Sequence, residues 1–182
     1  MSSRGPLWTP SPERVASSRL TAFADAFLQP APPAGGFSYD DLHRRSIDRR
    51  DLFWRAVWDV CGVIGDPGAP DRALVDDAMP GARYFPDASL NFAENVLRRR
   101  DDRDAVVFLR EDGDAQTLSG ADLYAEVSKI AAALRAWGVQ PGDRVAGYLP
   151  NIPEAIIAAL AAASIGAVWS SCSPDFGVQG IL

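Results

Sequence analysis

Two short apolar runs near the C-terminal end of the chain, separated by a helix-length segment, predict a pair of parallel strands. The runs are Arg144–Leu149 and Ala167–Ser171. The segment between them is rich in Ala and Ile and stops at Gly166, which is typical of a helix followed by a left-handed glycine. Asn151 is the expected N-cap of this helix, with Glu154 completing a capping box. Because two parallel strands joined by a helix are the basic unit of a parallel sheet, the pattern predicts an α/β fold.

The loop after the second strand is the candidate binding site. In open α/β sheets, ligands bind beyond the carboxyl ends of the strands, and Ser171, Cys172, Ser173 and Pro174 occupy that position. The same residues also fit a purely structural role. Ser173 suits a helix N-cap, with Pro174 at the first helical position and Asp175 in the first turn.

A hairpin and a long helix are expected just before these strands. Ala105–Arg110 and Ala115–Leu118 flank a glycine-containing turn, which predicts two antiparallel strands. Ser119 and Asp122 form a capping box for a helix that stops at Gly138. The apolar positions of this helix that we expect to face inward are Leu123, Val127, Ile130, Ala131, Leu134 and Trp137.

The N-terminal half of the chain reads as helical. One helix is expected after Ser11, Gln29–Gly36 reads as a loop, and Phe37–Gly62 forms a second helical region in which Ser46 and Asp48 are alternative caps. The apolar stripe of the first helix, which we expect to pack on a core, comprises Val15, Leu20, Phe23, Ala24, Phe27 and Leu28.

A mixed charge run, Arg98–Asp104, is expected to be a solvated connector rather than a phosphate-binding patch, because its charges alternate in sign. It also marks the expected domain boundary. Residues 1–100 are predicted to be a helical N-terminal extension, and residues 101–182 the first part of a parallel α/β domain. That domain is expected to be incomplete at its C-terminal end, because the last helix stops in apolar residues with no cap.

Composition limits the classes of function. With 47% hydrophobic and 23% charged residues the chain is typical of globular proteins, and a net charge of −6 disfavours binding to nucleic acid or anionic membranes. The longest apolar stretch, Ala155–Trp169, is too short to span a membrane. Cys61 and Cys172 have no metal or redox spacing, so two free thiols and a cytoplasmic location are expected.

The residues alone assign no catalytic chemistry. There is no Walker loop, no dinucleotide-binding glycine motif and no nucleophile elbow. His43 is the single histidine, so neither a multi-histidine metal site nor a histidine triad can form within this chain, and we expect it on a solvated helix face. Cys172 is expected to be a small packing residue rather than a nucleophile, because no neighbouring base is apparent. We therefore assign no catalytic and no metal-binding residue.

Several segments together resemble the N-terminal part of acyl-CoA synthetases of the adenylate-forming superfamily. They are YFPDASLNFAENVL, VAGYLPNIPEAIIAALAAASI and GAVWSSCSPDFG. The stretch YDDLHRRSIDRRDLFWRAVW resembles the helical extension shared by acetyl- and propionyl-type members, and WSSCSPDFG is similar to the loop of acetoacetyl-type members. The likeness covers nearly the whole chain.

The resemblance implies a two-step ligation, in which ATP activates a carboxylate as an acyl-adenylate and coenzyme A then displaces AMP, with Mg²⁺ offsetting the phosphate charge. It implies acetoacetate as the acid, and it places Ser171, Cys172, Ser173 and Pro174 near the CoA and acyl end of the site. The phosphate loop and the catalytic lysine of such enzymes lie beyond the part that this chain resembles, so the chain alone is expected to be inactive.

Two alternatives stay open from the sequence. The acid could be another short one, such as acetate or propionate. The chain could also be a non-catalytic module that binds a CoA-like ligand or pairs with another subunit. The oligomeric state cannot be derived from the sequence.

Overall fold

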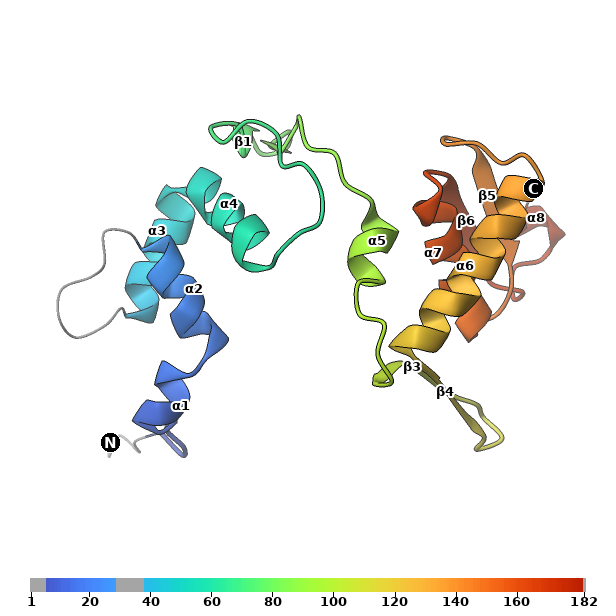
Figure 1. The fold of residues 1–182 in the computed structure, drawn as a ribbon, viewed down its shortest axis with the longest axis horizontal. Coiled ribbons are helices and arrows are strands. Elements are labelled where there is room, and N and C mark those ends of the chain that lie inside the picture. The colour runs from blue at the N-terminus through green and yellow to red at the C-terminus, as the bar shows by residue number, and fades with distance from the viewer. Residues whose placement is uncertain (1–5, 29–37, 182) are drawn as a thin grey trace. The chain divides into compact units, whose positions relative to one another are not determined.

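The computed structural model describes residues 6–28 and 38–181 of the chain (Figure 1). The chain divides into two units, Met1–Ser89 and Leu90–Leu182, each with its own contacts. The expected loop Gln29–Gly36 lies outside the described residues. In the parts that are described, no helix is long and apolar enough to cross a membrane.

The first unit is mainly helical, and serine caps set where its helices begin. Ser11 and Ser38 each accept a hydrogen bond from a backbone N–H of the helix that follows. Ser18 accepts one from the N–H of Thr21 at 3.0 Å, and it thereby divides the expected first helix in two. The elements are α1 (Pro12–Ala16), α2 (Arg19–Phe27), α3 (Tyr39–Asp48), α4 (Arg50–Val60), β1 (Leu74–Asp76) and β2 (Arg83–Tyr84).

The core of the first unit is aromatic. Phe53 on α4 meets the rings of Phe23 and Phe27 on α2 edge-on, with centroids 5.6 Å apart in both pairs. The buried side chains of this core are Ala24, Phe27, Leu28 and Leu42, and Phe23 and Phe53 are partly buried against them. The expected stripe of the first helix is therefore confirmed only in its second half. Val15 on α1 and Leu20 in the first turn of α2 are both exposed. The break at Ser18 separates Val15 from the buried stripe of α2.

The second helical region, predicted at Phe37–Gly62, breaks at Arg49. Neither Ser46 nor Asp48 caps a helix there, so both expected caps are wrong. Ser46 instead donates its hydroxyl hydrogen bond back to the carbonyl of His43, 2.7 Å away. The imidazole of His43 is exposed and stacks on the ring of Tyr39, which confirms the expected solvated helix face.

The second unit contains the predicted hairpin, helices and parallel strands. The strands β3 and β4 pair antiparallel, and β5 and β6 pair parallel with Arg144 opposite Val168. The helix α6 packs against α7, which joins the two parallel strands. The elements are α5 (Phe92–Val96), β3 (Asp104–Leu109), β4 (Ala115–Ser119), α6 (Gly120–Ala136), β5 (Arg144–Tyr148), α7 (Pro153–Ser164), β6 (Val168–Cys172) and α8 (Val178–Ile181).

The core of the second unit lies where α6 and α7 meet. Its buried side chains include Leu123, Val127, Ala131 and Leu134 of α6, and Ile157, Leu160, Ala161 and Ala162 of α7. Two expected core residues, Ile130 and Trp137, are exposed instead. They lie at the edge of the apolar stripe on α6, and Ile130 lines an open surface hollow of about 410 Å³ together with Leu149 and Pro153.

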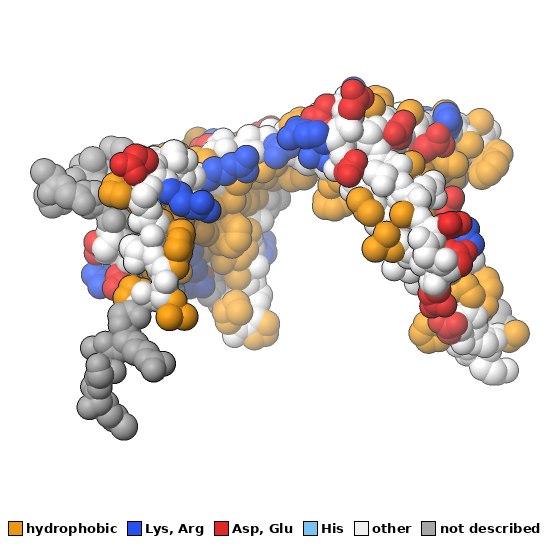
Figure 2. Space-filling model, turned by 90° about the horizontal axis from the view of Figure 1, so that it is seen from below, with side chains coloured by type: hydrophobic (Ala, Val, Ile, Leu, Met, Phe, Trp, Pro, Cys, Tyr) orange, Lys and Arg blue, Asp and Glu red, His pale blue; other side chains and the backbone are white. Residues whose placement is uncertain are grey.

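The parallel strands are less buried than an apolar run predicts. Along β5, Gly147 is buried and Val145 packs on the core, whereas the alternate residues Ala146 and Tyr148 are exposed. This alternation arises because the helices cover one face of the two-stranded sheet and leave the other face open. Figure 2 shows hydrophobic side chains at the surface of both units.

The ends of α7 differ in part from the prediction. Asn151 is not its N-cap, since Ile152 occupies that position without a side-chain hydrogen bond. The C-terminal end is as expected, and Gly166 follows it with φ of 77°. Asn91, which the sequence did not single out, binds this end. Its Nδ2 donates to the carbonyl of Ser164 at 3.1 Å, while its Oδ1 accepts from the N–H of Glu94 and caps α5.

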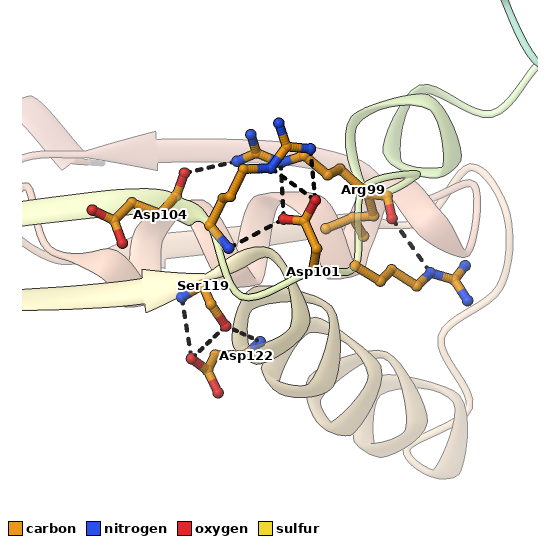
Figure 3. A network of polar contacts seen from close by, with 8 residues as sticks. Arg99, Asp101, Asp104, Ser119 and Asp122 are labelled. Carbon is orange, nitrogen blue, oxygen red and sulfur yellow. Dashed lines mark hydrogen bonds and ion pairs between the residues drawn. The ribbon is translucent and has the colours of Figure 1, made fainter.

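The charge run Arg98–Asp104 is exposed, as expected, but it also has a defined structure (Figure 3). Asp101 accepts hydrogen bonds from the guanidinium of Arg103 at 2.6 and 2.9 Å. The backbone carbonyls of Asp101 and Arg103 accept from the first N–H groups of α6, at 3.1 and 3.0 Å. The run therefore belongs with α6 in the second unit, which begins at Leu90. A functional boundary at residues 100/101 stays a prediction.

Candidate functional site

The candidate site lies at the carboxyl ends of β5 and β6. The parallel register continues to the last residues of both strands, where Tyr148 lies opposite Cys172. One further backbone hydrogen bond, from the N–H of Leu149 to the carbonyl of Cys172, extends the pairing at 3.4 Å. The two chains leave the sheet side by side at the edge where α/β proteins bind ligands.

After Cys172 the chain forms a turn and not the expected helix. The hydroxyl of Ser173 donates to Oδ2 of Asp175 at 2.8 Å and accepts from the Asp175 N–H at 3.3 Å. The N–H of Phe176 then bonds to the Ser173 carbonyl at 3.1 Å. Such local bonds compete with helix formation, so α8 begins only at Val178 and Ser173 is not a helix N-cap.

A second residue that the sequence did not single out lies at this edge. Tyr148 donates its hydroxyl hydrogen bond to the carbonyl of Pro174 at 2.9 Å, with a longer contact of 3.4 Å to the carbonyl of Phe176. The pattern of β5 gave no sign of this contact, because it joins residues 26 positions apart in the sequence.

The four candidate residues form one short surface segment. Ser171 and Pro174 are exposed, whereas Cys172 and Ser173 are half-buried. Cys61 and Cys172 form no disulfide, as expected. Hydroxyl and backbone groups of this kind can hydrogen-bond a polar ligand, but the segment itself supplies no acid–base pair. Within residues 6–28 and 38–181, no group of three or more His, Cys, Asp or Glu could hold a metal ion.

Comparison with known proteins agrees with this geometry. The family profile described as AMP-binding enzyme matches residues 92–181, and the one described as acetyl-coenzyme A synthetase N-terminus matches residues 39–96. Acetoacetyl-coenzyme A synthetase of Rhizobium meliloti is 48% identical over 183 residues, which is 100% of this chain and 28% of that protein. A malonamoyl-CoA synthetase of Penicillium aethiopicum is 40% identical, over 85% of this chain and 23% of that protein.

A solved structure shows similarity to the same kind of enzyme. The acetoacetyl-CoA synthetase from Streptomyces lividans is 44% identical and superposes with a TM-score of 0.79, over 98% of this chain and 28% of that one. Residues 92–181 match the AMP-binding enzyme family, and the fold is α/β with a helical N-terminal segment. The whole chain is similar to the acetoacetyl-CoA synthetases, which confirms the resemblance stated from the sequence. It spans 28% of the length of the relative from Rhizobium meliloti.

Proposed function

We propose that the protein carrying this chain is an ATP-dependent, AMP-forming ligase that joins acetoacetate to coenzyme A. The observation that carries the proposal is the 48% identity with an acetoacetyl-CoA synthetase along 100% of the chain. The structural likeness to the Streptomyces lividans enzyme, with a TM-score of 0.79 over 98% of the chain, supports the same activity. We also propose a cytoplasmic location, which two cysteines that form no disulfide favour.

The proposed reaction has two displacement steps. A carboxylate oxygen of acetoacetate attacks the α-phosphorus of ATP, and pyrophosphate leaves with the electrons of the broken P–O bond. The thiol sulfur of CoA then attacks the carbonyl carbon of the adenylate, loses its proton and forms the thioester as AMP leaves. Mg²⁺ would neutralise charge on the phosphates. We assign no residue of this chain to the metal, because its described residues form no cluster that fits one.

The part of the reaction that we assign to this chain is the approach of CoA. Ser171 and Cys172 end β6, and Ser173 and Pro174 follow it, at the carboxyl edge of the parallel pair where a ligand is expected. We propose that they line the path of the thiol-bearing arm of CoA. Because the chain spans 28% of the relative from Rhizobium meliloti, we expect it to be inactive in both steps when it is expressed alone.

The names of two relatives limit the choice of acid substrate in this proposal. One makes an acetoacetyl thioester and the other a malonamoyl thioester. The corresponding acids differ only in a terminal methyl group versus an amino group, and both carry a carbonyl β to the carboxylate. We propose that the acid pocket requires this β-carbonyl group, and that acetoacetate is preferred.

The test is ATP–pyrophosphate exchange by the purified native protein, which reports the first step without CoA. Acetoacetate should support fast exchange, malonamate slower exchange, and butyrate little, because butyrate has the same chain length as acetoacetate but no β-carbonyl. Exchange that is fastest with acetate or propionate would instead favour a ligase for another short acid.

An intact-mass measurement tests the non-catalytic alternative. A native product several times heavier than the 19.5 kDa of this chain would leave room for the remaining ligase machinery. A product of 19.5 kDa without exchange activity would overturn the ligase proposal and favour a module that binds a CoA-like ligand or pairs with another subunit.

A further inference from the structure

A side chain on β5 contacts the turn that follows β6. Tyr148 is the last residue of β5, and its hydroxyl reaches the segment that leaves β6, with an O···O distance of 2.9 Å to Pro174 and 3.4 Å to Phe176. The residue is 55% exposed, so burial of its ring alone gives little reason for a tyrosine at this place. The phenolic oxygen is the part of the side chain that makes a specific contact.

The turn at 173–176 has its own shape, set by the bonds between Ser173, Asp175 and Phe176. Those bonds do not determine how the turn is oriented on the sheet, since each joins residues at most three positions apart. The contact from Tyr148 acts on that orientation, because it runs from the neighbouring strand to the middle of the turn. Rotation of the turn about its junction with β6 would break it.

We propose that Tyr148 is a positioning residue, which holds the 173–176 turn so that Ser171–Pro174 keeps one geometry for the thiol-bearing arm of CoA. This inference rests on the proposed ligase function. The tyrosine does not touch the reacting atoms in this proposal. It fixes the carbonyl of Pro174, and with it the backbone on which Ser173 is carried.

The variant Tyr148→Phe removes one oxygen and keeps the ring. Loss of one partly exposed hydrogen bond should raise the KM for CoA about fivefold. The rate of ATP–pyrophosphate exchange, which does not require CoA, should change much less. Tyr39→Phe is the matched control, because that exposed tyrosine belongs to the first unit and stacks on His43. It should leave the KM for CoA at its wild-type value.

A second measurement separates failure of the inference from failure of the proposed function. Hydrogen exchange followed by mass spectrometry should show faster exchange of the amides of Ser173 and of residues 175–177 in Tyr148→Phe than in the wild type. Unchanged exchange there overturns the positioning role, whether or not the protein is a ligase. Faster amide exchange with no rise in the KM for CoA also overturns it, because the turn would then move without consequence. A wild-type protein without any ligase activity overturns the proposed function and, with it, the role toward CoA.

Discussion

The indole of Trp169 on β6 lies directly over Gly147 on β5. A Cβ atom at position 147 would be 2.5 Å from Cη2 and 2.8 Å from Cζ2 of the indole. It would also be 2.7 Å from Cδ2 of Leu149. Real Cβ contacts are not this short, so the indole packs here because residue 147 has no side chain. A glycine at position 147 thus leaves room for the Trp169 indole on one face of the paired strands.

The variant Gly147→Ala should destabilise the protein by about 1–3 kcal/mol, because the added methyl group must displace an aromatic ring from a packed position. The midpoint of urea or thermal unfolding measures the loss. Gly177→Ala is the matched control, since a Cβ at that position has no heavy atom within 4 Å. Equal shifts for the two variants would contradict the packing argument.

A second glycine allows a close approach of two backbones. Gly120 is the first residue of α6, and a Cβ there would lie 2.6 Å from the carbonyl oxygen of Arg99 and 3.2 Å from that of Asp101. In an unhindered helix Ala is favoured over Gly by about 1 kcal/mol. Here the clash with backbone atoms should exceed that gain, so Gly120→Ala is expected to lower the unfolding midpoint. A raised midpoint would show that the charge run moves aside at little cost.

Much of this fold could be predicted because it depends on contacts within a few residues. The capping box of Ser119 and Asp122, the hairpin and the glycine stops all belong to this group. The errors have a different origin. Asn is a residue type that commonly caps helices, yet the N-cap of α7 is Ile152 and not Asn151. Ile130 fits the apolar period of α6 but stays exposed, at an open hollow beside α7.

The candidate site could be predicted only as a location. The strand–helix–strand pattern placed Ser171–Pro174 at the carboxyl end of a parallel pair, and the register confirms that placement. Its binding role stays a proposal. Two long-range side-chain contacts were missed because they join distant parts of the sequence, one at the candidate site and one at the C-terminal end of α7. Tyr148 reaches a residue 26 positions away, and Asn91 reaches one 73 positions away.

The capping box predicts a specific pH dependence. The hydrogen bond from the Ser119 side chain, and then the one from its backbone N–H, lower the pKa of the Asp122 carboxyl below its ordinary value of 3.8. A carboxyl whose pKa is lower in the folded state stabilises the protein above pH 3.8, and the contribution disappears as the pH falls through the lowered pKa. The stability difference between wild type and Asp122→Asn should therefore be largest near neutral pH and shrink in acid.

The variant Ser119→Ala gives the matching control for that pH dependence. It removes the hydroxyl that donates to Oδ2 of Asp122 at 2.6 Å and leaves the carboxyl in place. Unfolding midpoints measured from pH 7 to pH 3 should show a smaller loss of pH-dependent stability than Asp122→Asn, because the backbone N–H of residue 119 still donates to the carboxylate. A difference that stays constant over this range would mean that Asp122 stabilises α6 without its charge.

The last prediction concerns the proposed path of CoA. Ser173 is half-buried at the strand end, so Ser173→Phe should fill the space beside the loop and raise the KM for CoA about tenfold, with less effect on pyrophosphate exchange. Ser173→Ala removes the hydroxyl that bonds Asp175 without adding bulk, and it should have a smaller effect. Ser128→Phe, on the exposed side of α6, controls for the added ring. If CoA dependence is unchanged in Ser173→Phe, the loop does not line the CoA path, because a phenyl group at that position would obstruct a thiol arm passing beside it.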